Sequence, residues 1–190
     1  MDGMNHAEAI METLFSIPEY RSHVRYRRET QTIMLGFSDG TKDGGYLQAN
    51  WSIFKTKEGL SAVCGRHDIK AVFFDGRGGP PARGGGKTQR FYAAQSRGIA
   101  NHAIQLTIQG QTITSLYGTR AHFIHNCEQL LTAGLSHGVS ERGIDIPEKS
   151  RQILEQLAHL SYKKYVELKN HSLFLPYLEN KSTLKYYGQA

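Results

Sequence analysis

Three short apolar segments, separated by longer helical stretches, limit most strongly how this chain can fold. They are Thr32–Phe37, Lys70–Phe74 and Ile104–Ile108. Short, nearly continuous apolar runs of this kind are typical of buried strands. Strands that alternate with helices form a parallel sheet with right-handed crossovers. Because about three parallel strands alone would leave two unpaired edges, we expect an α/β fold that is a partial (β/α) barrel.

Helical periodicity covers most of the remaining sequence, which contains no internal repeat and no low-complexity tail. A length of 190 residues suits one domain, or one piece of a larger one. We therefore predict a single, mostly helical unit with additional C-terminal helices. The predicted helices cover approximately residues 5–17, 20–28, 44–67, 88–97, 120–136, 147–169 and 173–178.

Composition excludes some classes of protein and leaves others open. Hydrophobic residues make up 39% of the chain, which is enough for a core, and no apolar run approaches the roughly 20 residues of a membrane helix. With no secretion signal at the start, we expect a cytoplasmic protein. Cys64 and Cys127 lack the spacing of a disulfide or zinc framework, so we expect both to be buried. His122 and His125 lie three apart on a predicted helix, but no third metal ligand is evident.

The segment Asp75–Thr88 consists largely of glycine and carries Arg77, Arg83 and Lys87 directly after the second predicted strand. Glycine lets the backbone approach a ligand closely, and arginine matches carboxylate or phosphate oxygens two at a time. The segment therefore favours binding of a small anion. A solvated linker or an RNA-binding tract are the alternatives, and the net charge of +6 suits either kind of anionic partner. A nucleotide phosphate loop does not fit, because Pro81 stands where its first glycine belongs.

Carboxylates and a lysine follow the first predicted strand, in Ser38–Gly45. Magnesium prefers oxygen ligands and often binds one or two carboxylates, and Asp39 directly follows the strand. Lys42 could hold a phosphate or carboxylate as a point charge. Asp39 and Asp43 could instead cap the helix predicted to begin near Gly44. Because carboxyl ends of parallel strands share one edge, we expect this segment and the glycine-rich one to form a single site.

These segments together resemble phosphoenolpyruvate carboxylase. Ile33–Gly45 is similar to the lysine active-site signature of that family, and Phe74–Gly86 to its glycine-rich catalytic loop. Ile108–Gln111, followed by Tyr117-Gly118, is similar to the next barrel strand of the family. The resemblance covers essentially the whole chain. It implies a (β/α) barrel that uses Mg²⁺ or Mn²⁺ to carboxylate phosphoenolpyruvate with bicarbonate, giving oxaloacetate and phosphate.

The resemblance also implies roles for individual residues. Asp39 would be one of two carboxylate ligands of the metal, and Lys42 the active-site lysine. Arg77 would bind phosphate, and Arg83 would hold carboxyphosphate and the enolate together. Gln109 would bind substrate at the end of the third strand.

The chain departs from the family pattern in two ways. Asp75 stands where a histidine often precedes Gly-Arg-Gly-Gly, while Phe37, Gly40 and Ala82 are smaller departures. Family members are also several times longer. The catalytic histidine, the second metal carboxylate and a C-terminal substrate arginine are not in this sequence. We therefore expect a fragment, inactive alone, whose partners are the remainder of the enzyme and the family's homotetramer, with no nucleic acid or membrane. The alternative is a basic Arg/Gly module that binds RNA or another polyanion.

Overall fold

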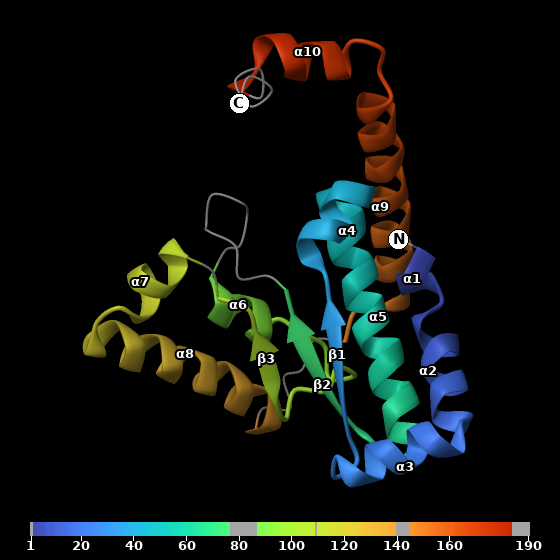
Figure 1. Cartoon of the computed structure of the whole chain (residues 1–190), viewed down its shortest axis with the longest axis vertical. Helices are drawn as coiled ribbons and strands as arrows, with labels where there is room; N and C mark the ends of the chain where they lie inside the picture. The colour runs from blue at the N-terminus through green and yellow to red at the C-terminus, as the bar shows by residue number, and fades with distance from the viewer. Residues whose placement is uncertain (1, 77–86, 109, 140–144, 184–190) are drawn as a thin grey trace.

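A small parallel sheet forms the centre of the computed structural model, which describes residues 2–76, 87–108, 110–139 and 145–183 (Figure 1). Strands β1 (Thr30–Leu35), β2 (Lys70–Asp75) and β3 (Ile104–Leu106) lie in the order β1-β2-β3. Both pairs of strands are parallel, and the register pairs Leu35 with Asp75 and Asp75 with Leu106. The predicted α/β class and the three parallel strands are confirmed. Within the described residues the sheet is open.

Helices make up most of the described chain, as predicted, and several continue after the last strand (Figure 1). Helix α5 lies between the sheet and α2, and α9 runs beside α5. On the other side of the molecule, α8 packs against α6 and α7. The helices are α1 (Asp2–Asn5), α2 (Ala7–Ser16), α3 (Pro18–Tyr26), α4 (Phe37–Gly44), α5 (Tyr46–Arg66), α6 (Thr88–Ala93), α7 (Gln111–Tyr117), α8 (Arg120–Val139), α9 (Glu148–Lys169) and α10 (Phe174–Lys181).

The hydrophobic core lies between α5, the sheet, α2 and α3. Phe73 from β2, Leu60 and Val63 from α5 and Val24 from α3 are each at most 1% exposed. Each such side chain stabilises the fold by about 1.5–3 kcal/mol relative to an exposed position. This core fixes β1 and β2 against α5, and so fixes the edge from which both candidate site segments leave.

Two of the strands are less buried than their apolar sequences predict. Met34 in β1 is 64% exposed and Ile104 in β3 is 37% exposed, whereas Ala71 and Phe73 of β2 are buried. Met34 is exposed because α5 covers one face of the sheet and Met34 lies on the opposite face from the buried residues. Ile104 pairs with Phe73 but belongs to the edge strand, which no further strand covers within the described residues. Uniformly buried strands were therefore a wrong prediction for β1 and β3.

The two cysteines also differ from each other. Cys64 on α5 is buried, and burial raises its pKa to about 11, so this thiol stays protonated at neutral pH. Cys127 on α8 is only half-buried, contrary to prediction, because α8 presents much of its surface to solvent. Both cysteines are free.

Candidate active site

The segments that follow β1 and β2 begin side by side at the carboxyl edge of the sheet. The backbone N–H of Gly76, directly after β2, donates to the carbonyl of Leu35 at the end of β1, at 3.0 Å. A β-carbon on Gly76 would lie 3.0 Å from that carbonyl oxygen, a tight contact that favours glycine here. On the other side, the N–H of Thr107 donates to the Asp75 carbonyl at 3.3 Å. The expected convergence of the strand ends is confirmed.

Residues 38–44 form a helix where the sequence predicts a loop before the long helix. Gly36 precedes α4 with extended backbone, and Gly45 ends it with a φ of 77°. The segment contains two glycines and two aspartates, so its own helix propensity is low. The cap expected from Asp43 is absent: Gly45 is the N-cap of α5, and no side chain makes a capping hydrogen bond there. Tertiary contacts therefore maintain this helix.

Asp39 and Lys42 lie one turn apart on α4. Lys42 Nζ is 3.2 Å from Asp39 Oδ1, and the two side chains are 72% and 83% exposed, respectively. Exposed pairs of this kind contribute little to stability, about 0–1 kcal/mol. Asp39 lies in the first turn of the helix, where the macrodipole favours a carboxylate. Both side chains are therefore held near the strand end and remain accessible to a ligand.

Asp39 also lines a hollow of about 380 Å³ at the carboxyl end of β1. Gly36, Gly40 and Asp43 contribute to its wall, together with apolar residues of α1 and β1. Asp39 and Asp43 therefore place two carboxylates on one wall, and a hard divalent cation prefers such oxygen donors. Within the described residues no group of three or more His, Cys, Asp or Glu side chains is placed to hold a metal, and this includes His122 and His125. The residues present fit one side of a metal site.

The last turn of α4 is held by α9. Tyr165 Oη donates to the Lys42 carbonyl at 2.8 Å, and Lys169 Nζ donates to the same oxygen at 3.1 Å. A cation at a helix C-terminus is favoured by the macrodipole, and the carbonyl has no partner further along the helix. No local sequence pattern indicates these contacts, because they join residues 123 and 127 positions apart.

Asp75 points into the protein, although its place at the start of the glycine-rich segment suggests an exposed position. It is 0% exposed, and its Oδ2 accepts hydrogen bonds of 2.8 Å from Lys57 Nζ and from Tyr92 Oη. Its Oδ1 has no hydrogen-bond partner among the described residues. The strand period could have revealed this orientation, because Asp75 shares a face of β2 with the buried Ala71 and Phe73.

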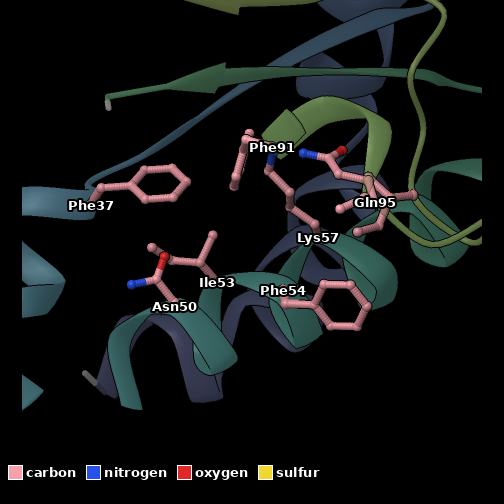
Figure 2. Close-up of a pocket in the computed structure, with 9 residues that line it drawn as sticks. Phe37, Asn50, Ile53, Phe54, Lys57, Phe91 and Gln95 are labelled. Atoms are coloured by element: carbon pink, nitrogen blue, oxygen red, sulfur yellow. The ribbon is translucent and has the colours of Figure 1, made fainter. Parts of the chain in front are cut away.

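A second, mostly apolar cavity of about 220 Å³ lies between α5 and α6 (Figure 2). Phe37, Ile53 and Phe91 line it, and the polar residues Asn50, Lys57 and Gln95 also lie in its wall. Gln95 Nε2 is buried and has no hydrogen-bond partner among the described residues. Neither Asp39 nor Lys42 lines this cavity, so it is distinct from the hollow at the strand end.

Comparison with known proteins identifies the family to which this chain belongs. The family model for phosphoenolpyruvate carboxylase matches residues 1–189. The phosphoenolpyruvate carboxylase of Corynebacterium diphtheriae is 34% identical over the whole chain, which corresponds to 21% of that protein. Those of Nitrosomonas eutropha and Roseiflexus castenholzii are each 37% identical over 88% and 91% of this chain, and over 18% of their own lengths. The chain belongs to the phosphoenolpyruvate carboxylase family. It spans about a fifth of the length of these curated relatives.

The phosphoenolpyruvate carboxylase signature residues divide into two groups. Asp39 and Lys42 lie together on α4, within hydrogen-bond reach of each other. Arg77, Arg83 and Gln109 lie outside the described residues, so their positions relative to that pair stay predictions. None of the described helices has the length and apolar composition that crossing a bilayer requires.

Proposed function

We propose that this chain carries one part of a phosphoenolpyruvate carboxylase active site, at which phosphoenolpyruvate and bicarbonate give oxaloacetate and phosphate. The main support is the exposed Asp39–Lys42 pair on α4. The pair lies on the helix that follows β1, and the last residue of β1, Leu35, accepts a hydrogen bond from Gly76 at the start of the glycine-rich segment. At one accessible edge, the carboxylate can bind a metal cation and the ammonium can bind an anionic substrate.

The aspartate, the lysine and the two arginines would contribute through their charges. Asp39 would bind Mg²⁺ or Mn²⁺, which when bound supplies a Lewis acid for the charge developing on the enolate oxygen. Lys42 would hold an anionic oxygen of the substrate as a point charge. Arg77 would bind phosphate, and Arg83 would keep carboxyphosphate and the enolate together while the new C–C bond forms. Gln109 would contact substrate from the end of β3.

The rest of the active site would come from sequence outside these 190 residues. The open edges of the sheet suit a (β/α) barrel that further strands would close. The catalytic histidine, the second metal carboxylate and the third substrate arginine would lie on those additional segments. A cytoplasmic homotetramer would be the complete enzyme.

Metal and substrate binding by the isolated chain test this proposal. Mn²⁺ titrations with phosphoenolpyruvate present, followed by electron paramagnetic resonance, should saturate. Asp39→Asn should weaken Mn²⁺ binding roughly tenfold or more, because it removes an anionic ligand. Asp68→Asn is the matched control, since Asp68 is exposed and its φ of 56° is tolerated by asparagine. Equal affinities for the two variants would contradict the metal role.

Experiments on the same purified chain also distinguish this proposal from the alternative function, RNA binding. Binding of an oligouridine RNA that falls steeply with salt and is unaffected by Asp39→Asn would favour the RNA-binding module.

Catalysis by the chain alone is a separate prediction. Catalytic groups that act as a unit are strongly non-additive, so a partial set does not retain a proportionate share of the rate. A coupled malate dehydrogenase assay with phosphoenolpyruvate, bicarbonate and Mg²⁺ should therefore detect no oxaloacetate. Turnover near the ~10 per second typical of enzymes would show that these residues suffice.

A further inference from the structure

Lys57 and Asp75 form an ion pair that is almost fully excluded from water. Their side chains are 2% and 0% exposed, and Lys57 Nζ lies 2.8 Å from Asp75 Oδ2. Removing two charges from water costs several kcal/mol per ion unless good hydrogen bonds compensate. Tyr92 Oη supplies such a bond to the same carboxylate oxygen at 2.8 Å. A costly arrangement of this kind calls for an explanation beyond packing.

The three residues come from three different elements. Lys57 lies on α5, Asp75 is the last residue of β2, and Tyr92 lies on α6. Asp75 therefore precedes, and Tyr92 follows, the glycine-rich sequence from Gly76 to Lys87. The hydrogen bond between Tyr92 and Asp75 joins the elements at the two ends of that sequence. Lys57 connects these two elements, β2 and α6, to α5 through its contacts with Asp75 and with the ring of Tyr92.

Aromatic rings enclose the ammonium group of Lys57. Its Nζ lies 5.1 Å from the ring centroid of Phe73, 5.3 Å from that of Phe91 and 5.8 Å from that of Tyr92. Figure 2 shows Lys57 extending from α5 toward Phe91. Cation–π attraction favours this placement, and the exclusion of water strengthens the ion pair. The ammonium is thus directed at Asp75 and kept from solvent.

We propose that Lys57, Asp75 and Tyr92 act as a clamp, a set of positioning residues that holds together the two ends of the sequence carrying Arg77 and Arg83. Asp75 is buried and faces Lys57. That the clamp serves substrate binding rests on the proposed function, whereas its existence as a structural tie does not.

Hydrogen–deuterium exchange on the full 190-residue chain tests the tie itself. Tyr92→Phe removes one hydroxyl and leaves the ring and the ion pair in place. Peptides spanning residues 76–93 should then exchange roughly tenfold faster, the effect of losing one hydrogen bond to a charged group. Peptides from β1 and α5 should be unchanged. Unchanged exchange in 76–93, or an equal increase in every peptide, would overturn the clamp.

A matched control uses another tyrosine. Tyr20 Oη on α3 donates to Gln31 Oε1 on β1 at the same distance, 2.8 Å, so this bond lies outside the clamp. Tyr20→Phe should leave exchange in 76–93 as it is in the wild type. A rise equal to that of Tyr92→Phe would show that the effect is not specific to the clamp.

A double variant separates positioning from stability. Lys57→Met with Asp75→Leu removes both charges and leaves neither one orphaned, so the fold should persist. Exchange in 76–93 should still rise, and phosphoenolpyruvate affinity should fall roughly tenfold while Mn²⁺ affinity stays unchanged. If the double variant exchanged residues 76–93 at the same rate as the wild type, the clamp would be overturned. If the wild-type chain binds no phosphoenolpyruvate, the proposed function fails, and the exchange data still decide the clamp.

Discussion

Gly45, between α4 and α5, has a backbone conformation that only glycine adopts readily. Its φ and ψ are 77° and 167°, and a β-carbon there would lie 3.1 Å from the ring of Tyr165. Gly45→Ala should therefore destabilise the protein by about 1–3 kcal/mol. Chemical denaturation of both forms measures the change in the free energy of unfolding.

A second glycine provides the control for that substitution. Gly65 lies in α5, and a β-carbon there would meet nothing within 4 Å. Gly65→Ala should be neutral or stabilising, by up to about 1 kcal/mol, because alanine is the better helix former. Destabilisation of the same size by both changes would show that the positive φ of Gly45 is not the cause.

Motif spacing predicted that Asp39 and Lys42 lie in one segment after β1, and their functional roles stay predictions, whereas the burial of Asp75 was not predicted. Asp39 and Lys42 lie in a continuous segment whose side chains are exposed, so local sequence was sufficient. The orientation of Asp75 depends on Lys57, 18 residues away on a helix, and on Tyr92, 17 residues away. Neither contact follows from a local pattern.

Among the elements, α9 is attached to α5 by charged side chains. Arg151 donates two hydrogen bonds to Glu58, at 2.7 Å and 2.9 Å, and Glu155 accepts hydrogen bonds from Trp51 and Lys55. Burial alone would raise the pKa of Glu58. Hydrogen bonds from Arg151 and Ser96 outweigh burial, so its pKa lies below the usual value. Ionised Glu58 therefore stabilises the docking of α9.

Glu58→Gln should reveal this contribution through its pH dependence. Because the folded-state pKa is lowered, the stabilisation is fully present above the unfolded pKa of about 4.5 and is lost as the pH falls through the folded value. The variant should be less stable by about 1 kcal/mol at pH 7, and the difference should shrink below about pH 4. Urea denaturation at a series of pH values measures it.

An exposed pair on α9 is the matched control. Glu167 pairs with Lys164 at 2.7 Å, and these side chains are 60% and 80% exposed. Glu167→Gln should change the free energy of unfolding by no more than about 0.5 kcal/mol at any pH. A pH-independent loss in Glu58→Gln would point to packing, not charge, as its cause.

Periodicity predicted the strands and the longer helices, and it missed the short helices α1, α4 and α7. Apolar spacing is a sufficient signal for α5, α8 and α9, which are each at least 20 residues long. The 8 residues of α4 include glycines, and the helix depends on Tyr165 and Lys169 far along the chain. The 7 residues of α7 are too few for a periodic signal.

At the scale of the molecule, much apolar surface is uncovered. The sheet has two unpaired edges within the described residues, and α8 exposes Leu131 and Leu135 by 66% and 65%. Leu160 on α9 and Leu175 on α10 are similarly exposed. Open edges and exposed leucines both favour association. The purified chain should form oligomers whose size rises with concentration in size-exclusion chromatography.

Charge substitution on α8 identifies the surface responsible. Leu131→Lys with Leu135→Lys should shift the elution toward the monomer. His125→Lys with Thr132→Lys adds the same two charges at exposed polar positions of the same helix and should not. A monomeric wild-type chain with one cooperative thermal transition would contradict the prediction and favour an independent module.

The hydrogen bonds from α9 to the Lys42 carbonyl also affect how the chain acquires its structure during synthesis. Tyr165 follows Lys42 by 123 residues. At about 5–20 residues per second, a ribosome releases the tyrosine roughly 6–25 s after the lysine. Throughout that interval the Lys42 carbonyl lacks the two donors that α9 supplies, while β1, α5 and β2 are already available to assemble. The helix that carries the proposed metal ligand is therefore completed late, after the core on which it rests.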